Sequence, residues 1–294
     1  MAVRDDFSAG EVLAAADLND TFASKPTKTS SATEPTSPAE GDLWFDENTT
    51  PPTAKFYDGT SWQTFSAGAA NFSNAATGTY TDTGVDYKYL TFTASGTLTV
   101  TKAGFADLLI LAGGGGTRTG STYTTGGGAG GMLELSSAYL PAGTLTVTVG
   151  AGGSNGGVGP SNHGSDSVLD TFVAVGGGGG GASGDAEAVG NSDTGGSGAG
   201  ASAASFNRPG LGVTNQGNTG GGVTGGGFAA GGGAGGAASG GTPGVGKASS
   251  ITGSSVTYAK GGASSGTNTA NTGDGGQGDN AGNSGVVIVR VRTN

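Results

Sequence analysis

The stretch Leu108-Leu109-Ile110-Leu111-Ala112-Gly113-Gly114-Gly115-Gly116 passes from a continuous apolar run into glycine, and Gly285-Val286-Val287-Ile288-Val289 reverses that order. Glycine is dense between the two, with runs at 176–181, 220–222, 225–227 and 231–233. Such composition is usual for linkers and disordered segments. Here apolar runs of strand length bound the region at both ends. We therefore expect an ordered region, with Leu108–Leu111 buried and the two apolar runs in one sheet.

The overall composition limits the class of protein. Charged residues are only 12% of the chain, whereas disordered chains usually carry many more. The formal net charge is −10, and the basic residues form no run of three, which argues against a nucleic-acid partner. Absence of cysteine excludes disulfides and thiolate metal sites. No apolar run approaches the ~20 residues of a membrane span, and no signal-peptide core follows Met1, so we expect synthesis in a cytoplasm without membrane insertion.

Three segments of different texture precede the glycine-dense region. Residues 1–24 form the first, and within it 5–24 predict a short N-terminal helix with Ser8 as N-cap and Pro26 beyond its end. Residues 25–40, rich in Pro, Ser and Thr, predict an extended linker. Residues 41–68 predict a small β module, in which Trp44 and Trp62 are expected to share one core. A unit of this size is too small to be stable alone, so we expect it to pack against another subunit or the next domain.

The remaining chain, residues 69–294, predicts a domain of β-strands and glycine segments. Strand patterns occur at Tyr87–Thr93, Thr97–Thr101, Ala106–Ala112, Met132–Leu135, Thr144–Val149, Ser167–Val175, Ser249–Tyr258 and Val286–Val291. Many of them run directly into glycines. The spacing is irregular, so the pattern is not a solenoid repeat.

Ordered glycine runs need an unusual source of stability. Glycine costs about 0.5–1 kcal/mol relative to alanine in regular structure, and it buries little side-chain area. Extended helices of the polyproline II type can pack closely when they are glycine, bonding N–H to C=O laterally. Collagen is excluded because the glycines in Gly220–Gly241 fall in all three registers. The expected fold class is mainly β and irregular: a short N-terminal helix, a small β module, and a β-sandwich-like base with packed polyglycine II helices.

No pattern of catalytic, cofactor-binding or metal-binding residues stands out. His163 is the only histidine, so neither a histidine metal cluster nor a catalytic histidine pair is available. Gly241-Thr242-Pro243-Gly244-Val245-Gly246-Lys247-Ala248 approaches a phosphate-binding loop but has Ala248 where Ser or Thr is needed. We predict no enzyme, cofactor or metal. An acidic pair for glycan hydrolysis would have to come from Asp166, Asp170, Asp185 and Glu187, whose spacing singles out none of them.

Two N-terminal motifs and the glycine-rich segment carry a resemblance to a known class. The opening Phe7-Ser8-Ala9-Gly10-Glu11-Val12-Leu13 is similar to an N-terminal segment of phage structural proteins. The unit Gly41-Asp42-Leu43-Trp44-Phe45-Asp46, with Tyr57-Asp58-Gly59-Thr60-Ser61-Trp62, looks like a short β module of such proteins. Segment 96–292 resembles their glycine-rich domains and, more loosely, tail-fibre tip adhesins and the extracellular glycine-rich domain of animal receptor kinases. The chain thus resembles bacteriophage fibre and tail proteins over most of its length.

In the adhesins, stacked glycine helices hold up distal loops that touch the host receptor. The matching candidates here are bends that carry bulky residues between glycine runs. An exposed aromatic ring beside an arginine suits a sugar or protein contact, although such rings also plug gaps at the ends of glycine rods. The candidate receptor-binding residues are Arg118, Tyr123, His163, Phe206 and Arg208.

The resemblance implies a virion fibre or tail protein, made in the host cytoplasm. Its N-terminal part would attach to other tail or capsid proteins, and its glycine-rich domain would display loops that bind a host-surface glycan or protein. The alternative is a decoration fibre on a capsid or tail, with a structural role and no dedicated receptor. The tryptophan module and a fibre context favour a homotrimer, whereas a glycine sandwich can be monomeric, so the oligomeric state stays open.

Overall fold

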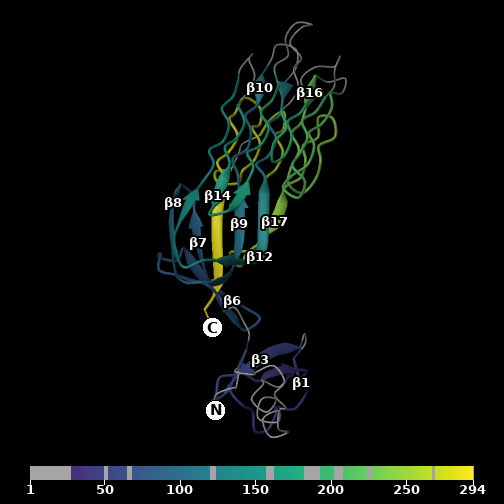
Figure 1. Cartoon of the computed structure of the whole chain (residues 1–294). Coiled ribbons are helices and arrows are strands. Elements are labelled where there is room, and N and C mark those ends of the chain that lie inside the picture. The colour runs from purple at the N-terminus through teal and green to yellow at the C-terminus, as the bar shows by residue number, and fades with distance from the viewer. Residues whose placement is uncertain are drawn as a thin grey trace, which may run out of the picture. The chain divides into compact units, whose positions relative to one another are not determined.

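The computed structural model describes residues 28–49, 52–64, 68–119, 124–156, 162–181, 193–201, 208–223, 227–266 and 269–293. The chain divides into two compact units, Met1–Ala67 and Gly68–Asn294 (Figure 1). Each unit is described by itself below.

The fold class expected from the sequence is wrong in its helical content. The described residues contain no helix, and about 38% of them lie in strands that form several small sheets. Residues 5–24, on which the N-terminal helix was predicted, lie outside the described residues. Between the strands, the described segments of the second unit are dominated by glycine, which disfavours helix by about 1 kcal/mol per residue relative to alanine. The fold is therefore β-strands joined by glycine-rich segments.

The first unit holds a four-stranded sheet. Its strands are β1 (Lys28–Ser31), β2 (Leu43–Asp46), β3 (Thr53–Tyr57) and β4 (Trp62–Thr64), in that spatial order. β1 pairs parallel to β2, and the other pairs are antiparallel. The rings of Trp44 and Trp62 meet edge to face with centroids 5.6 Å apart, which confirms the predicted shared core. β1 lies in the segment predicted as a linker, since Lys-Thr-Ser-Ser has no apolar residue to mark a strand.

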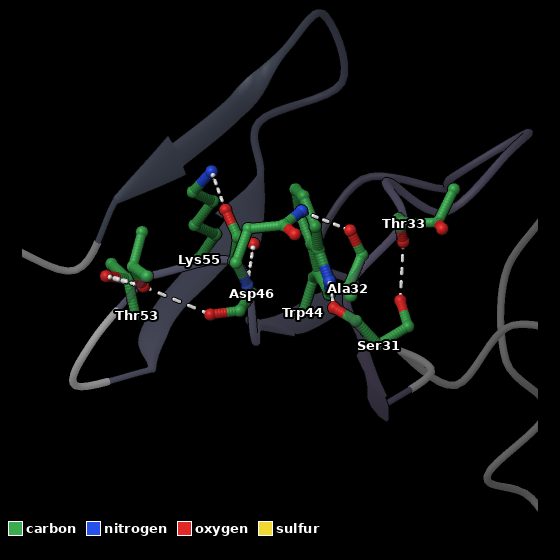
Figure 2. Close-up of polar contacts among 9 residues, drawn as sticks. Ser31, Ala32, Thr33, Trp44, Asp46, Thr53 and Lys55 are labelled. Atoms are coloured by element: carbon green, nitrogen blue, oxygen red, sulfur yellow. Dashed lines mark hydrogen bonds and ion pairs between the residues drawn. The ribbon is translucent and has the colours of Figure 1, made fainter.

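Side-chain contacts fasten β1 and β3 to β2 (Figure 2). Trp44 Nε1 donates to the carbonyl oxygen of Ser31 at 3.0 Å. Lys55 Nζ donates to Asp46 Oδ2 at 2.8 Å, and this hydrogen bond lowers the pKa of the Asp46 carboxyl. The two buried side chains of β2 therefore bond to different strands: Trp44 to β1 and Asp46 to β3.

The second unit is built on two antiparallel five-stranded sheets. The first has the order β12-β9-β19-β7-β6, and the second β15-β14-β13-β8-β5. The bounds in the first sheet are β6 Gly78–Asp82, β7 Val85–Phe92, β9 Gly104–Leu111, β12 Met132–Leu140 and β19 Val286–Arg292. In the second they are β5 Asn71–Phe72, β8 Gly96–Lys102, β13 Gly143–Thr148, β14 Ser167–Leu169 and β15 Phe172–Ala174. Apolar side chains from both sheets form one core, so the sheets are the two layers of a sandwich.

The two apolar runs that bound the glycine region lie side by side, as predicted. β9 pairs antiparallel with β19, with Leu108 opposite Val289 and Leu111 opposite Val286. Leu108–Leu111 are fully buried, since both faces of β9 are covered. Leu108 and Ile110 face the core of the sandwich. Leu109 and Leu111 face the other way and pack with Ile251 and Tyr258 from the hairpin of β17 (Lys247–Ser249) and β18 (Val256–Tyr258).

Backbone hydrogen bonds join the glycine-rich segments laterally. Gly115 N donates to Gly128 O at 2.9 Å, Gly128 N to Gly178 O at 2.8 Å, and Gly178 N to Ser197 O at 2.9 Å. These residues are buried, and the segments run alongside one another beyond the sandwich (Figure 1). The bonding predicted between neighbouring glycine runs is thus present. The interior of this glycine-rich part is made of hydrogen-bonded backbone, where most domains have packed side chains.

Close approach explains why these positions are glycine. Gly115 donates to Gly128 O, accepts from Gly276 N at 2.8 Å, and lies against Gly178 O, where a Cβ atom would overlap with the carbonyl. Three segments therefore enclose this residue. A side chain of any size at Gly115 would push at least one of them away.

Candidate functional site

The two ends of the second unit lie together. Phe105 N donates to Gly68 O at 3.1 Å, and Thr293 N donates to Asp86 O at 2.9 Å, so the first and last described residues of the unit are tied to the sandwich. Both ends also line one hollow, formed by 69–71 on one side and 292–293 on the other. The chain therefore enters and leaves the unit at the sandwich.

A small three-stranded sheet lies at the opposite end of the unit, far from β6 (Figure 1). It consists of β10 (Arg118–Thr119), β11 (Thr124–Thr125) and β16 (Phe228–Ala229). β10 and β11 pair antiparallel, and β11 and β16 pair parallel, with Thr124 opposite Phe228. Candidate contact residues were predicted in this part of the chain, because here the glycine runs give way to larger side chains.

Arg118 is inside the unit and not on its surface. Its side chain is 2% exposed and is the largest of the fully buried ones among the described residues. Burial lowers the pKa of its guanidinium, which still stays protonated at neutral pH. Thr117 and Thr125 beside it are also fully buried. Because the neighbouring glycines supply no side chains, one long side chain fills the space between segments. The structure thus places Arg118 in the interior, and its predicted role in receptor binding stays a prediction.

His163 and Arg208 are exposed. His163 Nε2 lies 2.8 Å from Asp193 Oδ2, and the two side chains are 50% and 36% exposed. The pair joins the segment that follows β13 to the segment 193–201, and it carries charge on both partners when the imidazole is protonated. Tyr123 and Phe206 lie outside the described residues. Asp193 was not singled out from the sequence, since thirty residues separate it from His163 and no motif links them.

The acidic residues weighed for glycan hydrolysis have local roles where they are described. Asp166 Oδ1 accepts from Gly176 N at 2.7 Å and so supports a glycine run. Asp170 lies in the tight turn between β14 and β15 with a φ of 53°. Asp185 and Glu187 lie outside the described residues. Within the described part of the chain, no three His, Cys, Asp or Glu side chains gather as a metal site would require.

A family model described as a glycine-rich domain matches residues 92–292, about two thirds of the chain. The chain belongs to this family of glycine-rich domains. The match covers the sandwich from the end of β7 onward, the glycine-rich segments and β19. Searching the curated proteins finds no match. In the described chain no helix is long and apolar enough to cross a membrane.

Proposed function

We propose that this chain is a virion fibre or tail protein whose glycine-rich domain displays host-binding loops. One observation carries the proposal. The chain enters and leaves the domain at the sandwich, and the glycine-rich segments extend from there to the β10–β11–β16 end. A domain that is tied at one end and carries the small β10–β11–β16 sheet at the other suits display of contacts away from an attachment point.

Backbone packing adds a second argument for display. A domain whose interior is hydrogen-bonded glycine holds its segments at close, fixed spacing. Contacts displayed on such segments start from fixed positions, which lowers the entropy cost of binding. In this proposal the N-terminal residues attach the chain to other tail or capsid proteins. The partner at the far end is a host-surface glycan or protein, and the chain has no catalytic role.

The attachment half of the proposal is tested by deletion. Virions are assembled with the full chain or with a chain lacking residues 1–65, and incorporation is measured by immunoblot of purified particles. We expect loss of incorporation, with the truncated chain still folded by circular dichroism. Undiminished incorporation would refute attachment through this part of the chain.

The display half is tested by adsorption. Tyr123→Ala, Phe206→Ala and Arg208→Ala are combined, and Arg118 is left intact because its side chain is buried. Lys247→Ala, an exposed cation on β17, is the matched control. We expect slower adsorption to host cells for the triple variant alone. Normal adsorption would favour the alternative, a decoration fibre with a structural role, and particle imaging would then locate the chain on head or tail and give its symmetry.

A further inference from the structure

A hollow of about 310 Å³ lies where the chain enters and leaves the sandwich. Its lining comes from both sheets: residues 69–71 at β5, Lys88 of β7, Lys102 of β8, and Arg292 with Thr293 at the end of β19. Three of these side chains are cations, and none is an acid. The chain has only 12 Lys and Arg against 22 Asp and Glu, so it is negatively charged overall. The hollow is therefore a locally positive site on an acidic protein.

The three cations have no carboxylate partner within the described residues. The ion pairs of that part of the chain involve Lys55, His163, Lys247 and Arg290, and none involves Lys88, Lys102 or Arg292. Asp86, the acidic residue nearest in sequence to Lys88, turns Oδ1 to the hydroxyl of Thr81 at 2.6 Å. Like charges gathered in one hollow repel one another, and an anion between them would remove that repulsion.

The position of each cation is set by its strand. Lys88 Nζ donates to Phe72 O at 2.9 Å and lies 4.2 Å from the centroid of the Phe72 ring. An ammonium has three donors, so two remain for a ligand. Burial lowers the pKa of Lys88, because part of its hydration is lost without a compensating charge. Lys102 lies opposite Asn71 in the β5–β8 pair, and its ammonium reaches Gly68.

Arg292 adds a planar donor set. It lies opposite Tyr87, so the register puts its side chain on the other face of the sheet from Lys88, and it reaches the hollow with Thr293 where β19 ends. A guanidinium presents paired donors that match the oxygens of phosphate or sulfate, and ammonium groups bind the same anions as point charges. Three positive charges around one hollow therefore suit a ligand of charge −2.

We propose that this hollow binds a tetrahedral oxyanion, phosphate or sulfate, either free or as the substituent of a small sugar. The volume is at the lower end of the range for ligand pockets and exceeds a bare anion, which leaves room for one attached ring. The site lies on the sandwich, away from the β10–β11–β16 end, so it is independent of the host-binding loops.

The test measures binding to the full chain by isothermal titration calorimetry at low salt. Inorganic phosphate and glucose 6-phosphate are the two probes. The variant Lys102→Gln/Arg292→Gln removes two exposed cations and leaves the partly buried Lys88 in place. Its control, Lys247→Gln/Arg208→Gln, removes the same net charge from exposed positions elsewhere. Circular dichroism checks that each variant is folded.

We expect saturable binding of one anion per chain, roughly tenfold or more weaker in the pocket variant, because two charge-assisted contacts are lost. The control should bind within about twofold of the wild type, since distant exposed charges are screened. Tighter binding of glucose 6-phosphate than of phosphate would assign the site to a sugar substituent, and equal binding to the free anion. Absence of saturable binding by the wild type, or equal loss in the control, would overturn the proposal.

Discussion

Arg290 and Asp107 form an ion pair across the two strands that bound the glycine-rich region. Arg290 Nε and Nη2 donate to Asp107 Oδ2 at 3.0 and 2.6 Å. Arg290 Nη1 donates to Tyr80 Oη at 2.5 Å, and Asp107 Oδ1 accepts from Ser137 N at 3.0 Å. The network therefore ties β19 and β9 to β6 and to the bulge of β12. Both charged side chains are less than a quarter exposed, so the pair is partly shielded from water.

Replacing Arg290 with Ala should destabilise the second unit by about 1–3 kcal/mol, because Asp107 keeps a partly buried charge without its partner. Urea unfolding measures the change. Arg292→Ala, two residues along the same strand and exposed, is the control and should shift stability by less than about 0.5 kcal/mol. If the two variants unfold at the same urea concentration, the pair does not stabilise the sheet.

Gly115→Ala tests the backbone core. The new methyl group would overlap with Gly178 O, so we expect a loss of about 1–3 kcal/mol or more in the free energy of unfolding. Gly96→Ala is the matched control, because its Cβ would meet Phe92 at an ordinary 3.7 Å. Urea unfolding of both variants gives the comparison. Equal stability of the two would show that the glycine segments can move apart freely.

Asp274 should make stability depend on pH. The carboxyl is buried, and burial raises its pKa, although Lys260 N donates to Oδ1 at 2.8 Å. A raised pKa in the folded state means that the folded protein binds this proton more tightly than the unfolded protein does. This contribution is fully present below the unfolded pKa of about 3.9 and is lost as pH rises through the folded pKa.

Asp274→Asn keeps the acceptor for Lys260 N and removes the buried charge. Relative to the wild type, the variant should therefore gain more thermal stability at pH 7.5 than at pH 3.5. Differential scanning calorimetry at the two values measures this difference. Asp170→Asn, an exposed turn position with φ 53° that asparagine also adopts, should show no such dependence. A gain from Asp274→Asn that is the same at both pH values would contradict the argument.

Local pattern was enough to find the strands that carry the core. The run Leu108–Leu111 is longer than an alternating strand allows, which correctly indicated burial on both faces. The hairpin that covers its second face, with Ile251 and Tyr258, is more than 130 residues away, and its own sequence does not indicate which surface it packs against. The predicted N-terminal helix falls on residues 5–24, outside the described residues. The described residues contain no helix, and glycine, which dominates the segments between their strands, disfavours one.

The candidate site was harder to predict than the fold. Arg118 was chosen because it lies in a bend with bulky residues between glycine runs, and the structure buries its side chain among segments that carry few others. Lys88 lies within the strand predicted at Tyr87–Thr93 and was not singled out from the sequence. Its role near Lys102 and Arg292 depends on the pairing of β7 with β19 and of β5 with β8. A cluster of charges that comes from strands far apart in the sequence can be predicted only once the strand order of the sheets is known.

His163 offers a test that separates receptor contact from structure. Its contact with Asp193 is an exposed pair, so His163→Ala should cost less than about 1 kcal/mol of stability. If the imidazole itself contacts the host, this variant should slow adsorption while its melting temperature stays near that of the wild type. Asp193→Ala breaks the same pair but keeps the imidazole, and it should then adsorb normally. Equal slowing in both variants would instead mean that the pair positions a loop, and normal adsorption in both would remove His163 from the contact surface.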